Sequence, residues 1–165
     1  MNTHILAIIF WTGLLLVFYA YLGYGLLLYL LVRVKRLFVS PASQVHDFFP
    51  ELTFIVCAFN EEDWMAEKIA NSLALDYPPD RICFFFVTDG SSDGTPDIVR
   101  QYPLPANSRW QLLHEPERRG KIAAFHRAML LVKTPFVVST DANTLVNPEA
   151  VRRIIRHFST PEIGA

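Results

Sequence analysis

The sequence predicts an α/β fold built on a parallel sheet, preceded by one helix that spans a membrane. Residues 5–32 carry no charged side chain, and this run exceeds the roughly 20 apolar residues that a helix needs to cross a bilayer. From residue 52 onward, short apolar runs alternate with helix-like segments, the pattern of parallel strands joined by right-handed crossovers. We therefore expect a Rossmann-like sandwich after the membrane helix.

Length, charge and cysteine content exclude several other classes. The chain has 165 residues, which corresponds to about one domain. Its net charge of -1 provides no basic excess for binding nucleic acid. Its two cysteines, Cys57 and Cys83, both fall within apolar runs. We expect them to be buried free thiols, not a disulfide or a metal site.

Residues 1–36 are expected to form an uncleaved N-terminal transmembrane anchor. Arg33, Lys35 and Arg36 directly follow the apolar run, so the positive-inside rule places the rest of this single-pass chain on the cytoplasmic side. A secretory signal peptide is the alternative, but it requires a positively charged start and a shorter apolar core. Residues 37–50 are expected to be a linker, and residues 51–165 the α/β domain.

The elements of this domain follow from the periodicity of its apolar residues. Short apolar runs bounded by polar or proline-rich segments predict strands, and apolar residues that recur on one face predict helices. Asn60 and Asn147 precede the first and last expected helices, where an asparagine side chain can cap the backbone. Strands are predicted at residues 52–57, 82–87, 110–113 and 136–139, and helices at residues 61–74, 93–102, 121–132 and 148–158.

A polar loop follows each of the four expected strands. Because the carboxyl ends of parallel strands meet at one edge of a sheet, the four loops can build one pocket there. The sequence contains no Walker loop. It also has no GxGxxG segment after the first strand, which argues against a dinucleotide cofactor. The loops are residues 58–62, 88–95, 114–121 and 141–143.

Three of these loops carry residues suited to a phosphorylated ligand. Asp141 and Asn143 could together hold a Mg²⁺ or Mn²⁺ that already carries phosphates, although both are also common in ordinary turns. Asp89 could accept a hydrogen bond from a sugar hydroxyl or a base. Lys121, at a helix start, could reach a diphosphate. The alternatives are a helix-capping turn around Asp89 and a solvated basic turn around Lys121.

Two further groups in these loops are expected to have no direct part in binding. Asp93 and Thr95 fit the pattern of a turn that starts a helix, so we expect them to be structural. Arg118 is expected to be a solvated residue of its basic turn.

Four segments in order, PELTFIVCAFNEE, VTDGSSDGT, RRGKIAAFHRA and FVVSTDANT, resemble the GT-A glycosyltransferases of family 2. This family includes cellulose, hyaluronan and poly-N-acetylglucosamine synthases. The resemblance runs from about Pro50 to the last residue, and an N-terminal membrane helix is also typical of the family. It implies a GT-A fold, a UDP-linked sugar donor, Mg²⁺ or Mn²⁺, a polysaccharide or lipid acceptor, and inversion at the anomeric carbon.

The resemblance also implies roles for individual residues. Ala58 and Glu62 correspond to the loop that flanks the uracil. Asp89 corresponds to the aspartate that contacts the nucleoside, and Lys121 to the basic residue near the phosphates. Asp141 and Asn143 correspond to the motif that holds the ribose and a divalent metal.

The chain departs from the family pattern in several places. Asn143 replaces the second aspartate of the metal motif, so the site loses one charge. Thr88 stands where many members have an aspartate, and His126 where an asparagine is common. The family's general base lies in a later loop and is expected beyond residue 165, so residues 51–165 are expected to be a truncated, donor-binding half.

Two alternatives to a complete glycosyltransferase stay open on the sequence alone. One is a fragment that binds a nucleotide sugar without turning it over. The other is a nucleotidyltransferase on a related fold. Such enzymes tend to place a glycine-rich phosphate loop after the first strand, and residues 57–60 contain no glycine.

Overall fold

The structure is a computed structural model that describes residues 3–38 and 48–159. The chain divides into two compact units, Met1–Gln44 and Val45–Ala165. The expected linker at residues 37–50 lies mostly outside the described residues, because only 37–38 and 48–50 are described, the first two as the end of a helix. Each unit has its own architecture.

The first unit is an apolar helical run with a change of pitch in its middle. Helix α1 (Thr3–Phe18) continues through a π-helical turn (Tyr19–Gly23) into α2 (Tyr24–Phe38). At this turn the backbone N–H of Tyr24 donates to the carbonyl of Tyr19, five residues earlier. The run Thr3–Leu37 is 35 residues long, and its most apolar window, with a mean hydropathy of 2.3, is not buried. Such a helix fits the predicted membrane anchor.

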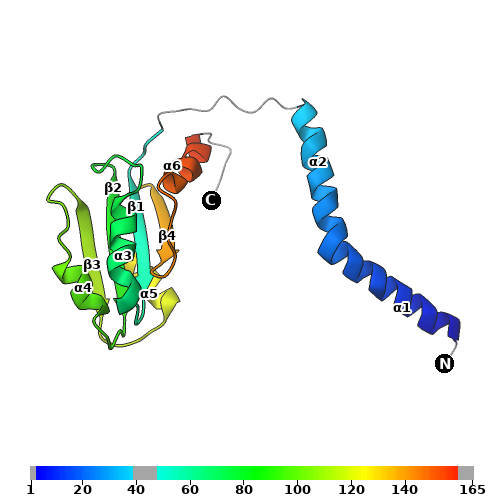
Figure 1. Ribbon diagram of the computed structural model, residues 1–165, viewed down its shortest axis with the longest axis horizontal. Coiled ribbons are helices and arrows are strands. Elements are labelled where there is room, and N and C mark those ends of the chain that lie inside the picture. Colours follow the sequence, from blue (N-terminus) through cyan, green and yellow to red (C-terminus); the bar gives the residue numbers. More distant parts are fainter. Residues whose placement is uncertain (1–2, 39–47, 160–165) are drawn as a thin grey trace. The chain divides into compact units, whose positions relative to one another are not determined.

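The second unit is built on a parallel sheet of four strands in the order β3-β2-β1-β4 (Figure 1). The chain runs outward from β1 to β2 and β3, and then returns to place β4 on the other side of β1. The topology therefore switches between β1 and β4, which is where open α/β sheets bind ligands. The strands are β1 (Leu52–Ala58), β2 (Ile82–Asp89), β3 (Arg109–Glu115) and β4 (Phe136–Asp141).

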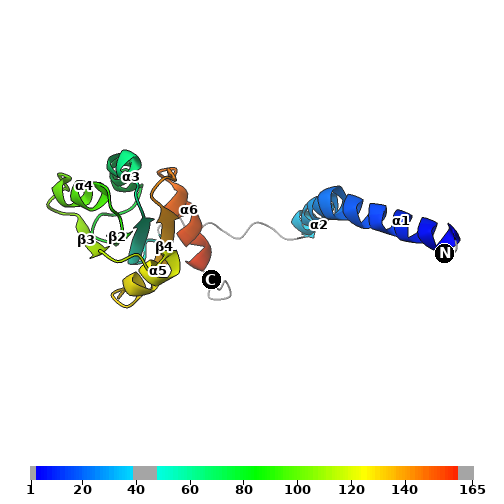
Figure 2. The ribbon, with the colours of Figure 1, turned by 90° about the horizontal axis from the view of Figure 1, so that it is seen from below.

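Helices cover both faces of this sheet, which confirms the predicted α/β sandwich (Figure 2). On one face, Phe54 and Phe86 pack in a core with α3 (Glu62–Leu73), α4 (Thr95–Gln101) and α6 (Ala150–Ile155). On the other face, Ile55 and Val87 pack against α5 (Lys121–Met129). Adjacent residues of β1 and β2 serve opposite cores because side chains alternate across a strand.

Several element ends differ from the predictions. Strand β3 extends to Glu115 because Asp89 and Glu115 still pair at its end. The last helix is shorter than predicted, because Ala150–Ile155 is followed by a 3-10 turn, Arg156–Ser159. Asn147 does not directly precede this helix, but its Oδ1 accepts the backbone N–H of Glu149 at 2.9 Å in the turn before it.

The predicted role of Asn60 as a helix cap is wrong. The residue before α3 is Glu61, and Asn60 has a φ of 52°, a left-handed conformation that asparagine tolerates better than most residues. Its side chain instead reaches the loop after β2, where Oδ1 accepts the backbone N–H of Ser92 at 2.9 Å. Asn60 therefore joins two loops.

Candidate functional site

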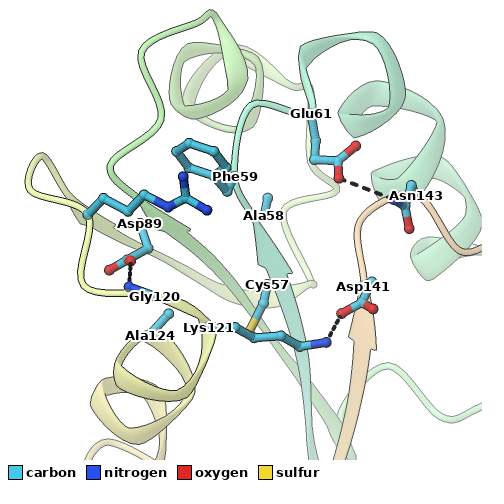
Figure 3. Close-up of a pocket in the computed structure, with 11 residues that line it drawn as sticks. Cys57, Ala58, Phe59, Glu61, Asp89, Gly120, Lys121, Ala124, Asp141 and Asn143 are labelled. Carbon is cyan, nitrogen blue, oxygen red and sulfur yellow. Dashed lines mark hydrogen bonds and ion pairs between the residues drawn. The ribbon is translucent and has the colours of Figure 1, made fainter.

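A pocket of about 270 Å³ lies at the carboxyl edge of the sheet, where the predicted loops converge (Figure 3). It includes residues from the end of β1, the end of β2, the start of α5 and the end of β4. Asp89, Lys121 and Asp141, which are far apart in the sequence, all contribute to its wall. The lining residues are Cys57, Ala58, Phe59, Glu61, Asp89, Arg118, Gly120, Lys121, Ala124, Asp141 and Asn143.

Lys121 and Asp141 form an ion pair across the pocket. The Nζ of Lys121 lies 2.6 Å from Oδ1 of Asp141, and both side chains are about half exposed or more. The hydrogen bond to Asp141, and then its negative charge, raises the pKa of Lys121. A cationic and an anionic side chain are thus held side by side, and each is accessible to a ligand of the opposite charge.

Asn143 is oriented by Glu61, a pocket residue that the sequence interpretation did not identify. The Nδ2 of Asn143 donates to Oε1 of Glu61 at 3.3 Å, so the amide nitrogen is engaged. The amide oxygen accepts only a long hydrogen bond of 3.5 Å from Oγ1 of Thr144, and it is the atom of this side chain that can act as a ligand. The backbone next to it is fixed to β1, because the N–H of Ala142 donates to the carbonyl of Cys57 at 3.2 Å. Glu61 also places a negative charge beside Asn143, the position where the family motif has a second aspartate.

The donor set fits a divalent cation only if a ligand supplies further oxygens. Among the described residues, no group of three or more His, Cys, Asp or Glu side chains could hold a metal ion. Asp141 and Asn143 offer one carboxylate and one amide oxygen. Mg²⁺ and Mn²⁺ that are bound with substrate phosphates typically take one or two protein ligands of this kind.

Asp89 is buried in the wall of the pocket and fixes the loop before α5. Its Oδ2 accepts the backbone N–H groups of Arg119 at 2.8 Å and Gly120 at 2.7 Å, and its Oδ1 accepts Nη1 of Arg127 at 3.3 Å. Burial disfavours the charged carboxylate, but these three donors outweigh burial and lower the pKa of Asp89. The residue is therefore ionised at neutral pH and holds two walls of the pocket together.

The pocket wall next to Asp89 is a cation–π pair that the sequence interpretation missed. Arg118 is exposed to solvent, as expected, but its guanidinium carbon also lies 3.6 Å from the ring centroid of Phe59. Gly90 permits this arrangement, because it has a φ of +69° and a Cβ there would lie 2.6 Å from the backbone N of Arg118. In the sequence, this contact could have been suspected from an aromatic residue directly after β1, Phe59, and a glycine directly after β2, Gly90.

The loops after β1 and β2 are braced by their own polar residues. Asp93 accepts the backbone N–H of Glu62 at 3.2 Å, and Thr95 accepts that of Glu61 at 2.9 Å. Glu62 itself accepts the N–H of Gly94 at 2.7 Å. Its carboxylate is thus occupied between the loops, and the pocket is lined by the neighbouring residue, Glu61.

A buried lysine, also missed, lies next to the Asp141–Asn143 loop. Lys68 of α3 is 0% exposed, and its Nζ donates to Oγ1 of Thr140 at 3.1 Å and to the carbonyl of Thr144 at 2.5 Å. Burial lowers the pKa of Lys68 to about 8, against the opposing effect of the Asp141 charge. Its position on the buried face of α3, with Met65, Ile69 and Ser72, was the sequence signal.

The two cysteines are free thiols, as predicted, but the prediction that both are buried holds only for Cys57, because Cys83 is half-buried. Cys57 is buried and lines the pocket, and burial raises the pKa of its thiol. Thr88, where many family members have an aspartate, is buried, and its Oγ1 lies 2.9 Å from Nδ1 of His114. Thr88 therefore supports the end of β2 from within the sheet.

The parallel sheet, with its pocket beyond the carboxyl ends of β1 and β4, has the GT-A type of α/β architecture. The solved structure of mannosyltransferase PcManGT from Pyrobaculum calidifontis, in complex with GDP-Man and Mn²⁺, shares this fold with a TM-score of 0.72 and 31% identity, over 88% of this chain and 43% of that one. TarS from S. aureus, in complex with UDP-GlcNAc, shares the fold with a TM-score of 0.60 and 20% identity, over 66% and 31%.

The sequence model described as Glycosyl transferase family 2 matches residues 53–165, and the chain belongs to this family. Poly-beta-1,6-N-acetyl-D-glucosamine synthase from Staphylococcus aureus (strain MSSA476) is 30% identical over 115 residues, 69% of this chain and 27% of the relative. The Staphylococcus epidermidis synthase of the same name is 26% identical over 121 residues, 73% and 28%. The chain thus spans little more than a quarter of these curated relatives.

Proposed function

We propose that the chain provides the donor-binding part of a glycosyltransferase. It would bind a UDP-linked sugar with Mg²⁺ or Mn²⁺, for transfer of the sugar with inversion to a polysaccharide or lipid acceptor. The observation that carries this proposal is the convergence of Asp89, Lys121 and Asp141 on one pocket at the topological switch of the sheet. Ligands of open α/β sheets bind at this point.

The proposal assigns a role to each site residue that the sequence predicted. Asp141 and the amide oxygen of Asn143 hold the divalent metal, which supplies positive charge to the diphosphate leaving group. Lys121 binds the phosphates, and Asp89 and Ala58 contact the nucleoside. Glu62 does not contact the ligand. It accepts a hydrogen bond from the loop after β2 and so keeps that loop in place beside the uracil base.

The ion pair of Lys121 with Asp141 suits the exchange of partners that this binding requires. With a metal and a diphosphate bound, Asp141 would hold the metal in place of the ammonium group, and Lys121 would hold a phosphate in place of the carboxylate. Both side chains are accessible, so the exchange leaves no charge buried without a partner.

The substitution Asp141→Ala tests the proposal. It removes the carboxylate of the metal pair, and we expect the affinity for UDP in the presence of Mn²⁺ to fall at least about tenfold, or about 1.4 kcal/mol. Isothermal titration of the full chain in detergent measures this affinity. The matched control is Asp97→Ala, which removes an exposed aspartate paired with Arg100 on α4 and should bind as the unmodified chain does. Equal affinities for all three proteins would refute the proposed site.

The names of the relatives support a nucleotide sugar as the donor. Whether its base is uracil or guanine needs a separate test. The curated relatives are named as synthases of an N-acetylglucosamine polymer, which supports a UDP-linked amino sugar. PcManGT was solved with GDP-Man and Mn²⁺, which supports a divalent metal and makes GDP the competing nucleotide. Parallel titrations with UDP and GDP distinguish the two, and tighter binding of GDP would correct the proposed donor.

Binding without turnover is the second candidate. Each of the three pocket carboxylates is already engaged: Asp141 with Lys121, Glu61 with Asn143, and Asp89 with the loop before α5. None is therefore left to act readily as the general base. Incubation of the chain with labelled UDP-sugar separates the candidates, because release of UDP indicates turnover and its absence with saturable binding indicates a binding module.

A further inference from the structure

We propose that Lys68 is a positioning residue for the loop that carries Asp141 and Asn143. Its buried ammonium group ties the two flanks of this loop together and so holds the two metal ligands in their binding geometry. The inference rests on the proposed function, because it concerns the same metal–diphosphate site. It adds a residue that does not line the pocket, is on a different element, and is not expected to touch the ligand.

The geometry places this ammonium group directly across the base of the loop. Lys68 extends from α3, and its two hydrogen-bond acceptors are Thr140 and Thr144, at 3.1 and 2.5 Å. One acceptor immediately precedes the three residues Asp141, Ala142 and Asn143, and the other immediately follows them. A single side chain thus sets the distance between the two ends of the loop.

Burying the ammonium group of Lys68 costs free energy, because the charge is removed from water. The side chain is fully buried, and its other neighbour is the ring of Phe54, whose centroid lies 5.8 Å from Nζ. Both hydrogen-bond acceptors are uncharged, so the cost of removing the charge from water is repaid only in part. An apolar residue of similar length would pack at this position with less penalty. A role in stability alone therefore does not explain a lysine here.

The charge that favours the protonated form of Lys68 is that of Asp141. The same carboxylate is the proposed metal ligand and the partner of Lys121. Lys68 therefore acts on this carboxylate in two ways. Its hydrogen bonds fix the backbone on both sides of Asp141, and its positive charge lies near enough to interact with the carboxylate itself.

The substitution Lys68→Met separates positioning from stability. We expect affinity for UDP with Mn²⁺ to fall about tenfold, while affinity for UDP in EDTA changes less than about twofold, because Asp89 and Lys121 remain. The thermal midpoint should change little, because removal of a buried charge and loss of the donor to the carbonyl of Thr144 have opposite effects on stability. Titration and thermal unfolding of the full chain in detergent measure these quantities. Glu67→Met, on the exposed side of the same helix, is the control and should match the unmodified chain.

A second variant and a measurement without ligand keep the proposal testable if Lys68→Met does not fold. Thr140→Val removes one acceptor of Lys68, and with it the 3.3 Å hydrogen bond from Thr140 Oγ1 to the carbonyl of Asp141, with little change of shape. It should weaken binding of UDP with Mn²⁺ about threefold. In Lys68→Met without ligand, the amide of Thr144, which donates to the carbonyl of Asp141 at 3.4 Å, should exchange with deuterium faster than in the unmodified chain.

The outcomes are distinct. If the unmodified chain does not bind UDP with Mn²⁺, the proposed function fails and this inference fails with it. If the unmodified chain binds and both Lys68→Met and Thr140→Val bind equally well, only the role of Lys68 is overturned. It is also overturned if Lys68→Met loses affinity equally with Mn²⁺ and with EDTA, because that pattern indicates general loss of structure.

Discussion

At the scale of single residues, the pocket depends on buried charges that hold its walls. Asp89 is 4% exposed and accepts hydrogen bonds from Arg119, Gly120 and Arg127. These donors come from the loop before α5 and from α5 itself. Asp89 is therefore both a candidate ligand contact and the residue that joins β2 to α5, and its substitution should affect stability as well as binding.

Asp89→Asn should destabilise the chain by about 1–3 kcal/mol at pH 7, because the charged bond to Arg127 is lost and a buried donor is left poorly paired. The pKa of Asp89 is lowered in the folded chain, so its stabilising effect is fully present above the unfolded value of about 3.9. This effect is lost as the pH falls through the lower, folded pKa. The difference in thermal midpoint between the two proteins should therefore shrink below about pH 4.

The exposed aspartate of α4 supplies the control for this pH series. Asp97→Asn should change the thermal midpoint little at any pH, because surface ion pairs such as that with Arg100 contribute little. A difference between the unmodified chain and Asp89→Asn that stays constant from pH 7 to pH 3 would contradict the account of Asp89.

At the scale of elements, close contact between loops gives the pocket its shape. The start of the loop after β2 stays bound to the end of β3, where the backbone N–H of Gly90 donates to the carbonyl of Glu115 at 2.8 Å. The same glycine faces the backbone of Arg118, whose side chain covers Phe59. Three segments from β1, β2 and β3 are thus positioned together at one corner of the pocket.

Gly90→Ala should destabilise the chain by about 2 kcal/mol or more, because it combines a left-handed φ with a clash against backbone. UDP binding should weaken at the same time, since the loop before α5 must move. Gly94→Ala is the control: its φ is -72°, and a Cβ there meets only the end of the Glu62 side chain, at 3.0 Å. Thermal unfolding that ranks Gly94→Ala as equally destabilising would contradict this explanation.

The sequence predicted the strands and the convergence of the loops, because both follow from period and topology. Apolar runs at 52–57 and 82–87 predicted buried strands because they are short and bounded by polar segments, and their parallel order brings Asp89, Lys121 and Asp141 to one edge. The sequence did not predict contacts between side chains of different elements. Asn60 looked like a local cap but bonds to Ser92.

The contributions of Glu61, Arg118 and Lys68 could not be read from the sequence for a similar reason. A charged residue on a helix or turn is usually solvated, and each of these is engaged only because another segment lies beside it. Lys68 is the clearest case: the helical period placed it on the buried face of α3, but only the fold shows that Thr140 and Thr144 are there to accept its hydrogen bonds.

At the scale of the whole molecule, the chain combines an apolar helical unit with an α/β unit of glycosyl transferase family 2. The run Thr3–Leu37 is long and apolar enough to cross a membrane, and Arg33, Lys35 and Arg36 at its end predict a cytoplasmic location for the second unit. This location stays a prediction.

The central claim is that one pocket binds a nucleotide diphosphate and its metal between Asp89, Lys121 and Asp141. The most direct test is a crystal structure of the chain with UDP and Mn²⁺, in which anomalous scattering locates the manganese. We predict an anomalous peak that places the manganese ion within coordination distance of a carboxylate oxygen of Asp141. The diphosphate should lie next to Lys121 and the nucleoside next to Asp89. Manganese away from Asp141, or UDP bound outside this pocket, would contradict the account.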